Sequence, residues 1–329
     1  MLAEGRQTRA GEQLYMKDLC SSHWPIVFIH QRDPRHVPKA LIHARASNPH
    51  SSIHLIGDSF NSGLVGVENH DLNQYSYSAN QLAATYRHLS SNSSEYELFC
   101  IQRWLYLNEF MAKNHLDRCV YLDSDVMVYS DLSQAALELG EFDMTTSQSS
   151  PHCNLVASKT VLDSFCRFIL ESYSKPIRYF GLPEFYHNLQ RQGSPGGVCD
   201  MTFFWLFMRN PEFKVRDLSE MAGPNAFDHS LNQSNGFQMH NGIKKLRWIN
   251  GRPHGFHLES SQWRRFHTLH FQGATKKYMA ANLQLNSISA RAQYTRNWIH
   301  SEFQRCRYKM SPRPVSIQER NALPGVVRV

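Results

Sequence analysis

Two short apolar segments separated by a helical segment constrain this chain more than any other feature of its sequence. Residues 25–29 (PIVFI) and 52–56 (SIHLI) have the length of buried strands, and residues 37–47 between them have helical character. Pro38 is compatible with that helix because it falls in the first turn. Two strands joined through a helix within about 35 residues form a βαβ unit, whose strands lie parallel. The sequence therefore predicts an α/β fold, with a mostly parallel sheet and helices on both faces.

The next predicted strand ends on two carboxylates. Residues 95–114 form a predicted helix with a broad apolar face, and strand 118–122 (RCVYL) follows it. Asp123-Ser124-Asp125 comes directly after this strand, and the apolar segment 126–129 follows the acidic pair. Open parallel sheets bind ligands at the C-terminal ends of their strands. The acidic pair is therefore expected at a ligand site.

The second half of the chain has a different pattern. Two Asn-Gly pairs, at 241–242 and 250–251, are typical of two-residue type I′ turns, so residues 237–258 predict a small antiparallel β-meander. A strand is expected over residues 268–271. Further helices are predicted around 80–88, over 160–173 and 201–208, and after Gly273, and the stretch from about 308 is expected to be weakly ordered.

Composition and charge exclude several classes of protein. The net charge is +7 (35 basic minus 28 acidic side chains), but no run of five like charges forms a nucleic-acid-binding arm. No apolar stretch approaches the about 18 residues of a transmembrane helix, and the polar N-terminus lacks a secretory signal. The 7 cysteines form no Cys-x-x-Cys pair and indicate no zinc site. We expect a cytoplasmic protein with reduced thiols, whose basic surface permits peripheral contact with the inner membrane face.

The acidic pair is a candidate metal site. Asp123 and Asp125 lie in a turn tight enough for both carboxylates to reach one cation. Hard oxygen ligands suit Mg²⁺ or Mn²⁺, which keep open positions for substrate phosphates. A bare Asp-x-Asp is common by chance, and a solvated strand cap is the alternative. The apolar runs on both sides favour the metal interpretation.

A second motif, LHFQGATKKY, lies at 269–278. His270 ends an apolar stretch, Gly273 allows close approach of the backbone, and Lys276 follows three residues later. This spacing offers one imidazole to a metal and one ammonium to a phosphate. A lone histidine is more often structural, but together with the acidic pair the motif predicts a three-ligand metal site with a cationic clamp for a diphosphate.

These two motifs resemble those of the GT-A glycosyltransferases. YLDSDVMV after a long helix, with HFQGATK near the end, is most similar to the retaining glycogenin and galactosyltransferase group, family eight. The similarity extends over about residues 25–280 in order and spacing, but only the two short motifs are specific. It implies transfer of a hexose from a nucleotide-diphosphate sugar, with a UDP-sugar favoured, Mn²⁺ or Mg²⁺ as cofactor, and retention of configuration. The implied acceptor is a glycan, a lipid-linked glycan or another hydroxyl compound, as in polysaccharide biosynthesis.

The resemblance also implies roles for individual residues. Asp123, Asp125 and His270 would be metal ligands, and Lys276 with Gly273 would contact the diphosphate. Arg103 and Asp200 correspond to family positions that face the donor sugar and the acceptor. The alternatives are a solvated helix charge for Arg103 and a helix N-terminal carboxylate for Asp200.

One family feature is missing. The aspartate that usually follows the first strand is replaced by the sequence Ile29-His30-Gln31-Arg32. Asp58, after the second strand, is the predicted substitute in binding the donor nucleoside. The expected organisation is a leader (1–24), a nucleotide-sugar-binding half (25–150), an acceptor-side half that closes the site (151–285), and a C-terminal helical segment with a tail (286–329).

Three other functions compete with glycosyl transfer. A nucleotidyltransferase that makes sugar nucleotides shares the sheet and the metal, but a Gly-rich basic loop normally follows its first strand, and HQRDPRHVP has no glycine. A phosphatase would carry its Asp-x-Asp on the first strand. A non-catalytic glycan- or anion-binding protein would use the basic surface and the aromatic side chains, but would leave the acidic pair without a purpose.

Overall fold

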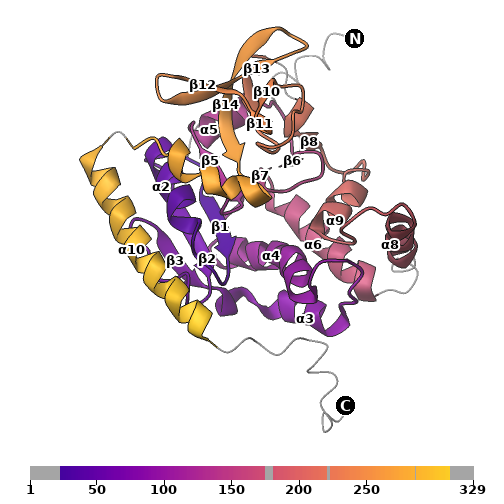
Figure 1. The fold of residues 1–329 in the computed structure, drawn as a ribbon. Coiled ribbons are helices and arrows are strands. Elements are labelled where there is room, and N and C mark those ends of the chain that lie inside the picture. The colour runs from indigo at the N-terminus through magenta and orange to yellow at the C-terminus, as the bar shows by residue number, and fades with distance from the viewer. Residues whose placement is uncertain (1–22, 175–180, 221–222, 286, 312–329) are drawn as a thin grey trace, which may run out of the picture.

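The computed structural model describes residues 23–174, 181–220, 223–285 and 287–311, and its centre is a seven-stranded sheet (Figure 1). The strand order is β3-β2-β1-β4-β7-β6-β8. Strand β7 is antiparallel to both β4 and β6, and all other neighbours in the sheet are parallel. The strands are β1 (Ile26–His30), β2 (Ile53–Gly57), β3 (Glu68–Asp71), β4 (Cys119–Leu122), β6 (Met144–Thr146), β7 (Cys153–Val156) and β8 (Val215–Asp217).

The predicted βαβ unit is present at the N-terminal end. Strands β1 and β2 are parallel, with Ile26 opposite Ile53, and helix α2 (Val37–Ser47) connects them with Pro38 in its first turn. Side chains of β1 alternate between two cores: Val27 contributes to one and Phe28 to the other, and both are fully buried. Helices therefore cover both faces of the sheet.

Each face of the sheet has its own set of helices (Figure 1). Helix α4 (Ser94–Lys113) covers one face together with α3 (Tyr77–Thr85), α6 (Lys159–Ser174) and α9 (Asp200–Phe207). Helices α2 and α5 (Leu132–Leu137) cover the other face. The long helix α10 (Ile288–Met310) packs against α2, and α8 (Gly181–Arg191) lies beside α9. The predicted α/β class, with a mostly parallel sheet between helices, is confirmed.

A second sheet forms in the C-terminal half and extends back to the acidic motif. Its strand order is β12-β13-β14-β5, and β9 pairs with β14 in parallel. The strands are β5 (Val126–Val128), β9 (Asn225–Phe227), β12 (Leu246–Ile249), β13 (Arg252–His257) and β14 (Gln262–His270). The predicted strand over 268–271 is thus the end of a longer strand that starts at Gln262.

The predicted antiparallel region is present, but it is not one continuous meander over 237–258. Both Asn-Gly pairs form hairpin turns, and Asn241 and Asn250 each have φ of 50°. The first turn joins β10 (Met239–His240) to β11 (Ile243–Lys244), and these two strands form a sheet of their own. At the break, the Lys244 backbone N–H bonds to the Leu231 carbonyl and the Lys244 side chain is buried.

Two other expectations differ from the structure in detail. Strand β3 was not expected, because its sequence ENHD is polar and mostly exposed at the sheet edge. The helix expected around 80–88 spans Tyr77–Thr85. Trp24, at the end of the predicted leader, is fully buried, and most of that leader and the tail beyond 311 lie outside the described residues.

Two further properties concern the described residues alone. None of their helices combines the length and the apolar character that a bilayer crossing requires. Their cysteines carry free thiols, and those of Cys119, Cys153 and Cys166 are buried.

A buried histidine on α2 makes the stability of the fold dependent on pH. His43 Nδ1 lies 3.3 Å from the Val128 carbonyl and Nε2 lies 2.9 Å from the Gln284 backbone N–H, so the ring is neutral, donating at Nδ1 and accepting at Nε2. Burial lowers the pKa of His43 from 6.5 to about 4. As the pH falls, His43 is protonated in the unfolded chain before it is protonated in the folded protein. The contribution of His43 to the free energy of unfolding is therefore complete above pH 6.5 and is lost as the pH falls toward 4.

We therefore expect His43 to account for up to about 3 kcal/mol of the stability lost on acidification. Urea denaturation at several pH values between neutral and acidic should show a shallower pH dependence in His43→Gln than in the parent protein. Parallel curves for the two proteins would contradict this expectation, whatever the absolute stability of the variant.

Candidate active site

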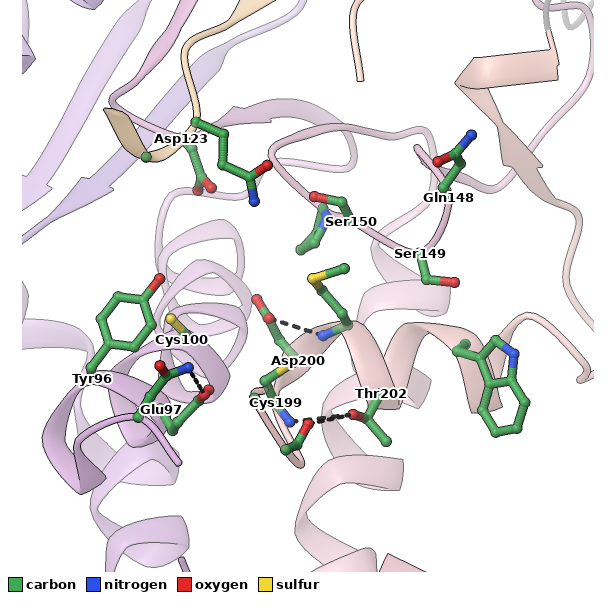
Figure 2. Close-up of a pocket in the computed structure, with 18 of the residues that line it drawn as sticks. Tyr96, Glu97, Cys100, Asp123, Gln148, Ser149, Ser150, Cys199, Asp200 and Thr202 are labelled. Carbon is green, nitrogen blue, oxygen red and sulfur yellow. Dashed lines mark hydrogen bonds between the residues drawn. The ribbon is translucent and has the colours of Figure 1, made fainter. Parts of the chain in front are cut away.

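A cavity of about 750 Å³ opens beside the C-terminal end of β4. Side chains of α4 and α9 and the loop 148–151 surround it, as Figure 2 shows. Its volume is within the range of about 300–1,000 Å³ that is usual for small-molecule sites. The cavity is lined by seven of the eight residues singled out in the sequence, namely Arg103, Asp123, Asp125, Asp200, His270, Gly273 and Lys276.

Pairing of β5 with β14 brings the two sequence motifs together. The strands are antiparallel, with His270 directly opposite Val126, the residue after the acidic motif. The Phe271 backbone N–H extends this pairing by donating to the Asp125 carbonyl over 2.9 Å. Positions far apart in sequence thus become neighbours through backbone hydrogen bonds.

Arg103 lies between two carboxylates at the centre of the site. Its Nη1 donates to Asp123 Oδ1 over 2.6 Å, Nε donates to Asp200 Oδ2 over 3.0 Å, and Nη2 also donates to Asp200 Oδ2. Tyr121 donates to the same Asp123 oxygen and Trp104 to the same Asp200 oxygen. Burial opposes the charge of Arg103, but Asp123 and Asp200 outweigh it and hold the guanidinium pKa well above its usual value. Arg103 is therefore a buried, fixed cation and not a solvated helix charge. Asp200 pairs with it through Oδ2 and also starts α9, where its Oδ1 accepts from the Met201 backbone N–H over 2.9 Å.

Asp125 is held by the cationic half of the second motif. Lys276 Nζ lies 3.0 Å from Asp125 Oδ2, and His270 Nε2 lies 3.6 Å from Oδ1. Burial disfavours the carboxylate, but His270 and Lys276 outweigh this effect and lower the Asp125 pKa. Asp125 is therefore an anion at neutral pH.

A group of buried polar residues fixes the orientation of the His270 ring. His270 Nδ1 lies 2.6 Å from the His229 carbonyl, which can only accept, so Nδ1 donates to it and Nε2 faces Asp125. The His152 ring stacks on His270 at 3.9 Å, and the His270 backbone N–H donates to Asp228. Burial lowers the pKa of His152 well below its usual value, which keeps this stacked ring neutral.

His30 occupies the position where the family's aspartate is missing, and it supports the acidic turn. Its Nε2 donates to the Asp33 carbonyl over 2.9 Å, so Nδ1 accepts from the hydroxyl of Ser124, also at 2.9 Å. Asp58, the predicted substitute for nucleoside binding, does not line the cavity. Its carboxylate accepts from the Arg32 backbone N–H over 2.7 Å and from Asn61 over 2.8 Å. In this structure Asp58 holds the loop after β1.

Two glycines act through different physical effects. Gly273 has φ of +57°, which favours glycine, and a Cβ at this position would have open space around it. The Gly273 backbone is therefore exposed to the cavity, with room for a ligand. A Cβ on Gly197 would instead lie 2.2 Å from the Leu89 carbonyl oxygen, so this glycine brings the start of α9 close to the segment before α4.

The donor set fits a divalent cation, provided that Asp123 turns. Asp125 and His270 Nε2 already converge, and two carboxylates with one imidazole suit Mn²⁺ or Mg²⁺. The Asp123 oxygen that would complete the set is engaged by Arg103 and Tyr121, and the three ligand groups do not lie within 4.8 Å of one another. A metal would therefore compete with Arg103 for Asp123.

Several contributors to the site were not predicted from sequence. Tyr121 belongs to an apolar strand run, and His152 has no motif around it. Lys244 and Asp228 form a fully buried ion pair with a 2.6 Å contact beneath His270. A lysine in a polar segment gives no signal of burial, so only the fold reveals these residues.

Comparisons with known proteins find similarity only among solved structures. No protein-family model and no curated protein matches the chain. The glycosyltransferase GlyE of Streptococcus pneumoniae TIGR4 is matched in one structure with TM-score 0.32, 15% identity and coverage of 60% of this chain and 45% of that one. Its apo form is matched with TM-score 0.39, 12% identity, 86% of this chain and 64% of that one. Mouse xyloside xylosyltransferase 1, in its apo form, is matched with TM-score 0.38, 12% identity, 59% of this chain and 84% of that one.

The chain thus spans less than two thirds of the length of GlyE in both structures. Similarity at this level defines neither a family nor an activity. The functional conclusion below rests on the geometry of the site.

Proposed function

We propose that this protein is a metal-dependent glycosyltransferase that moves a sugar from a nucleotide-diphosphate sugar, with a UDP-sugar favoured, to a hydroxyl acceptor. The observation that carries the proposal is the convergence of three aspartates, one imidazole and two basic side chains on one cavity at the end of β4. This arrangement suits a substrate that has a polyanionic leaving group next to a sugar. In a glycosyltransferase Asp123 and Asp125 would bind the metal, whereas a non-catalytic binding protein would have no use for this acidic pair.

The diphosphate would lie beside Asp125, His270 and Lys276. A divalent cation held by Asp123, Asp125 and His270 would supply positive charge to the leaving diphosphate. Lys276 adds a second charge to the same group, and its side chain is 37% exposed and so can turn from Asp125 to a phosphate. The open space at Gly273 gives the donor access to this end of the cavity.

The sugar would lie near Asp200, on the other side of Arg103. Asp200 is 3% exposed, and one of its oxygens is held by Arg103 and Trp104. A carboxylate fixed in this way can stabilise positive charge at the anomeric carbon as the bond to phosphate breaks. Arg103 sets the position of Asp200 through two hydrogen bonds to one carboxylate oxygen, which makes Arg103 a positioning residue. The proposed retention of configuration rests on the family resemblance.

The acceptor would enter on the side of α8 and α9. Phe185 and Trp205 line this part of the cavity with their ring centroids 6.3 Å apart, and Tyr96 contributes a third ring from α4. Aromatic faces suit the C–H faces of pyranose sugars. We propose a glycan or lipid-linked glycan as acceptor, with peripheral contact with a membrane surface as part of this proposal.

A direct experiment tests the function. The full chain is incubated with UDP-, GDP- and ADP-sugars and Mn²⁺, and release of the nucleoside diphosphate is measured with and without a chelator. Turnover of one donor, lost on chelation and restored by Mn²⁺, supports the proposal. Binding of glycans without turnover of any donor would favour the binding protein instead.

Lys276→Ala is expected to weaken binding of both the nucleoside diphosphate and the sugar donor. Charged hydrogen bonds contribute about 1.5–3 kcal/mol, so we expect about 10- to 100-fold weaker affinity by calorimetric titration. Lys277→Ala is the matched control, because Lys277 is the exposed neighbour that does not line the cavity. A loss confined to acceptor affinity would move Lys276 out of the donor site.

A further inference from the structure

A second group of polar side chains lies at the edge of the main sheet, outside the cavity. In the register of β2 and β3, His54 is opposite Glu68 and Ile56 is opposite His70, so His54, Glu68 and His70 share one face. Each of the three offers a ligand atom, and these atoms all lie within 4.8 Å of one another. No other group of three His, Cys, Asp or Glu side chains in the described part of the chain is this close.

The spacing of these atoms matches a tetrahedral zinc site. His54 Nδ1 lies 3.1 Å from His70 Nε2 and 3.4 Å from Glu68 Oε2. Bonds from zinc to imidazole nitrogen or carboxylate oxygen measure about 2.0–2.2 Å, which places tetrahedral ligand atoms about 3.3–3.5 Å apart. Small side-chain movements would therefore bring all three groups to bonding distance of one ion.

The far side of each histidine ring has its own oxygen partner. His54 Nε2 lies 2.9 Å from Ser52 Oγ, and His70 Nδ1 lies 3.3 Å from the Tyr75 hydroxyl. If both far nitrogens donate to these oxygens, both near nitrogens carry lone pairs that face each other. Metal-binding histidines are oriented in this way by hydrogen bonds from the remote N–H. With that pair of tautomers one cation can bind both near nitrogens, whereas the other tautomers make the 3.1 Å contact a hydrogen bond between the two rings.

The surroundings hold the two rings and leave a path from solvent. Both rings pack against Phe110 of α4, with centroid distances of 5.2 Å for His54 and 5.0 Å for His70. His54 is 6% exposed, whereas the Glu68 side chain is 61% exposed and can close over an ion that enters from solvent. Two imidazoles and one carboxylate suit zinc better than Mg²⁺ or Ca²⁺, which prefer oxygen ligands.

We propose that His54, Glu68 and His70 bind a structural Zn²⁺, with water as the fourth ligand. The ion links the short edge strand β3 to β2 and, through Tyr75, to the 3₁₀ helix η1 (Leu72–Tyr75). Strand β3 is polar and only four residues long, so burial of apolar side chains contributes little to its attachment to the sheet. A zinc ion would supply the missing stabilisation at this edge.

The test measures zinc binding to the full chain, in a background where the proposed metal site of the main cavity lacks one of its three ligands. The parent is Asp125→Asn, and His70→Gln, Glu68→Gln and His240→Gln are each added to it. His240 is an exposed histidine on β10 and serves as the control. Zn²⁺ affinity is measured by competition with a chromophoric chelator, and the melting temperature is measured with and without Zn²⁺.

We expect the parent and the His240 variant to bind one Zn²⁺ and to melt at a higher temperature when it is present, because the ion binds the folded state. His70→Gln and Glu68→Gln should bind at least about tenfold more weakly, since even the outer partners of zinc ligands are worth about 10- to 100-fold. Glu68 is exposed, so its replacement leaves the fold intact and keeps the test valid if His70→Gln is unstable. Equal zinc affinity in all four proteins, or no zinc uptake by the parent, would overturn the proposal.

Discussion

Replacement of Asp125 by asparagine is expected to reduce sugar transfer by at least about a hundredfold while the protein stays folded. Asp125 is the carboxylate that faces both His270 and Lys276, so the variant loses a proposed metal ligand and the partner of the Lys276 ammonium. Electrostatic groups at reacting centres are typically worth about 10²–10³ in rate. The fold should survive, because Lys276 is 37% exposed and can turn to solvent.

Two measurements on this variant separate chemistry from folding. Nucleoside diphosphate release gives the activity, and the loss of the free Mn²⁺ signal in electron paramagnetic resonance gives metal binding. Asp117→Asn is the control, because Asp117 is an exposed carboxylate just before β4, at the opposite end of the same strand. Full activity and unchanged Mn²⁺ binding in Asp125→Asn would refute the metal assignment.

The second large effect is expected at Arg103, on stability as well as on activity. The side chain is 12% exposed and pairs with both Asp123 and Asp200. Removal of one member of a buried ion pair typically costs about 3–5 kcal/mol, because the remaining charges stay buried without a partner. We therefore expect Arg103→Met to lose about 3 kcal/mol in urea denaturation and to lose most of its activity.

Arg103→Lys separates the charge of this residue from its shape. A lysine restores one positive charge but cannot contact two carboxylates in the forked geometry of a guanidinium. The lysine variant should recover part of the stability and little of kcat, whereas KM for the donor should change less. Arg296→Met, an exposed substitution on α10, controls for the loss of a surface charge. Equal stability of the Met and Lys variants would show that the ion pair contributes little.

The parts of the fold that could be predicted are those whose signal is local. Strands β1 and β4 are short apolar runs that are buried on both faces, and α4 repeats its apolar side chains at helical spacing. Each pattern needs only its own residues to be recognised. The acidic motif and the His-x-x-Gly-x-x-Lys motif were recognisable for the same reason.

The rest depends on contacts between distant segments. Nothing in the sequence of β5 indicates that it leaves the main sheet and pairs with β14, and nothing near Lys244 indicates that it is buried against Asp228. Strand β3 escaped prediction because an exposed edge strand needs no apolar pattern. The aspartate missing after β1 was identified from sequence, but only the structure shows that His30 supports the acidic turn in its place.

The β5–β14 pairing has a consequence for how such a chain can change. Because the backbone ladder sets the distance between Asp125 and His270, that distance is independent of how many residues separate them along the chain. An insertion or deletion in a surface loop between β5 and β14 leaves this pairing in place, provided that the ladder keeps its register. A slip of one residue in β14, by contrast, would turn His270 to the opposite face of its strand. The intervening segment also carries Asp200 and Asp228, which contact Arg103 and His270, so only its surface loops away from the cavity are open to change in length.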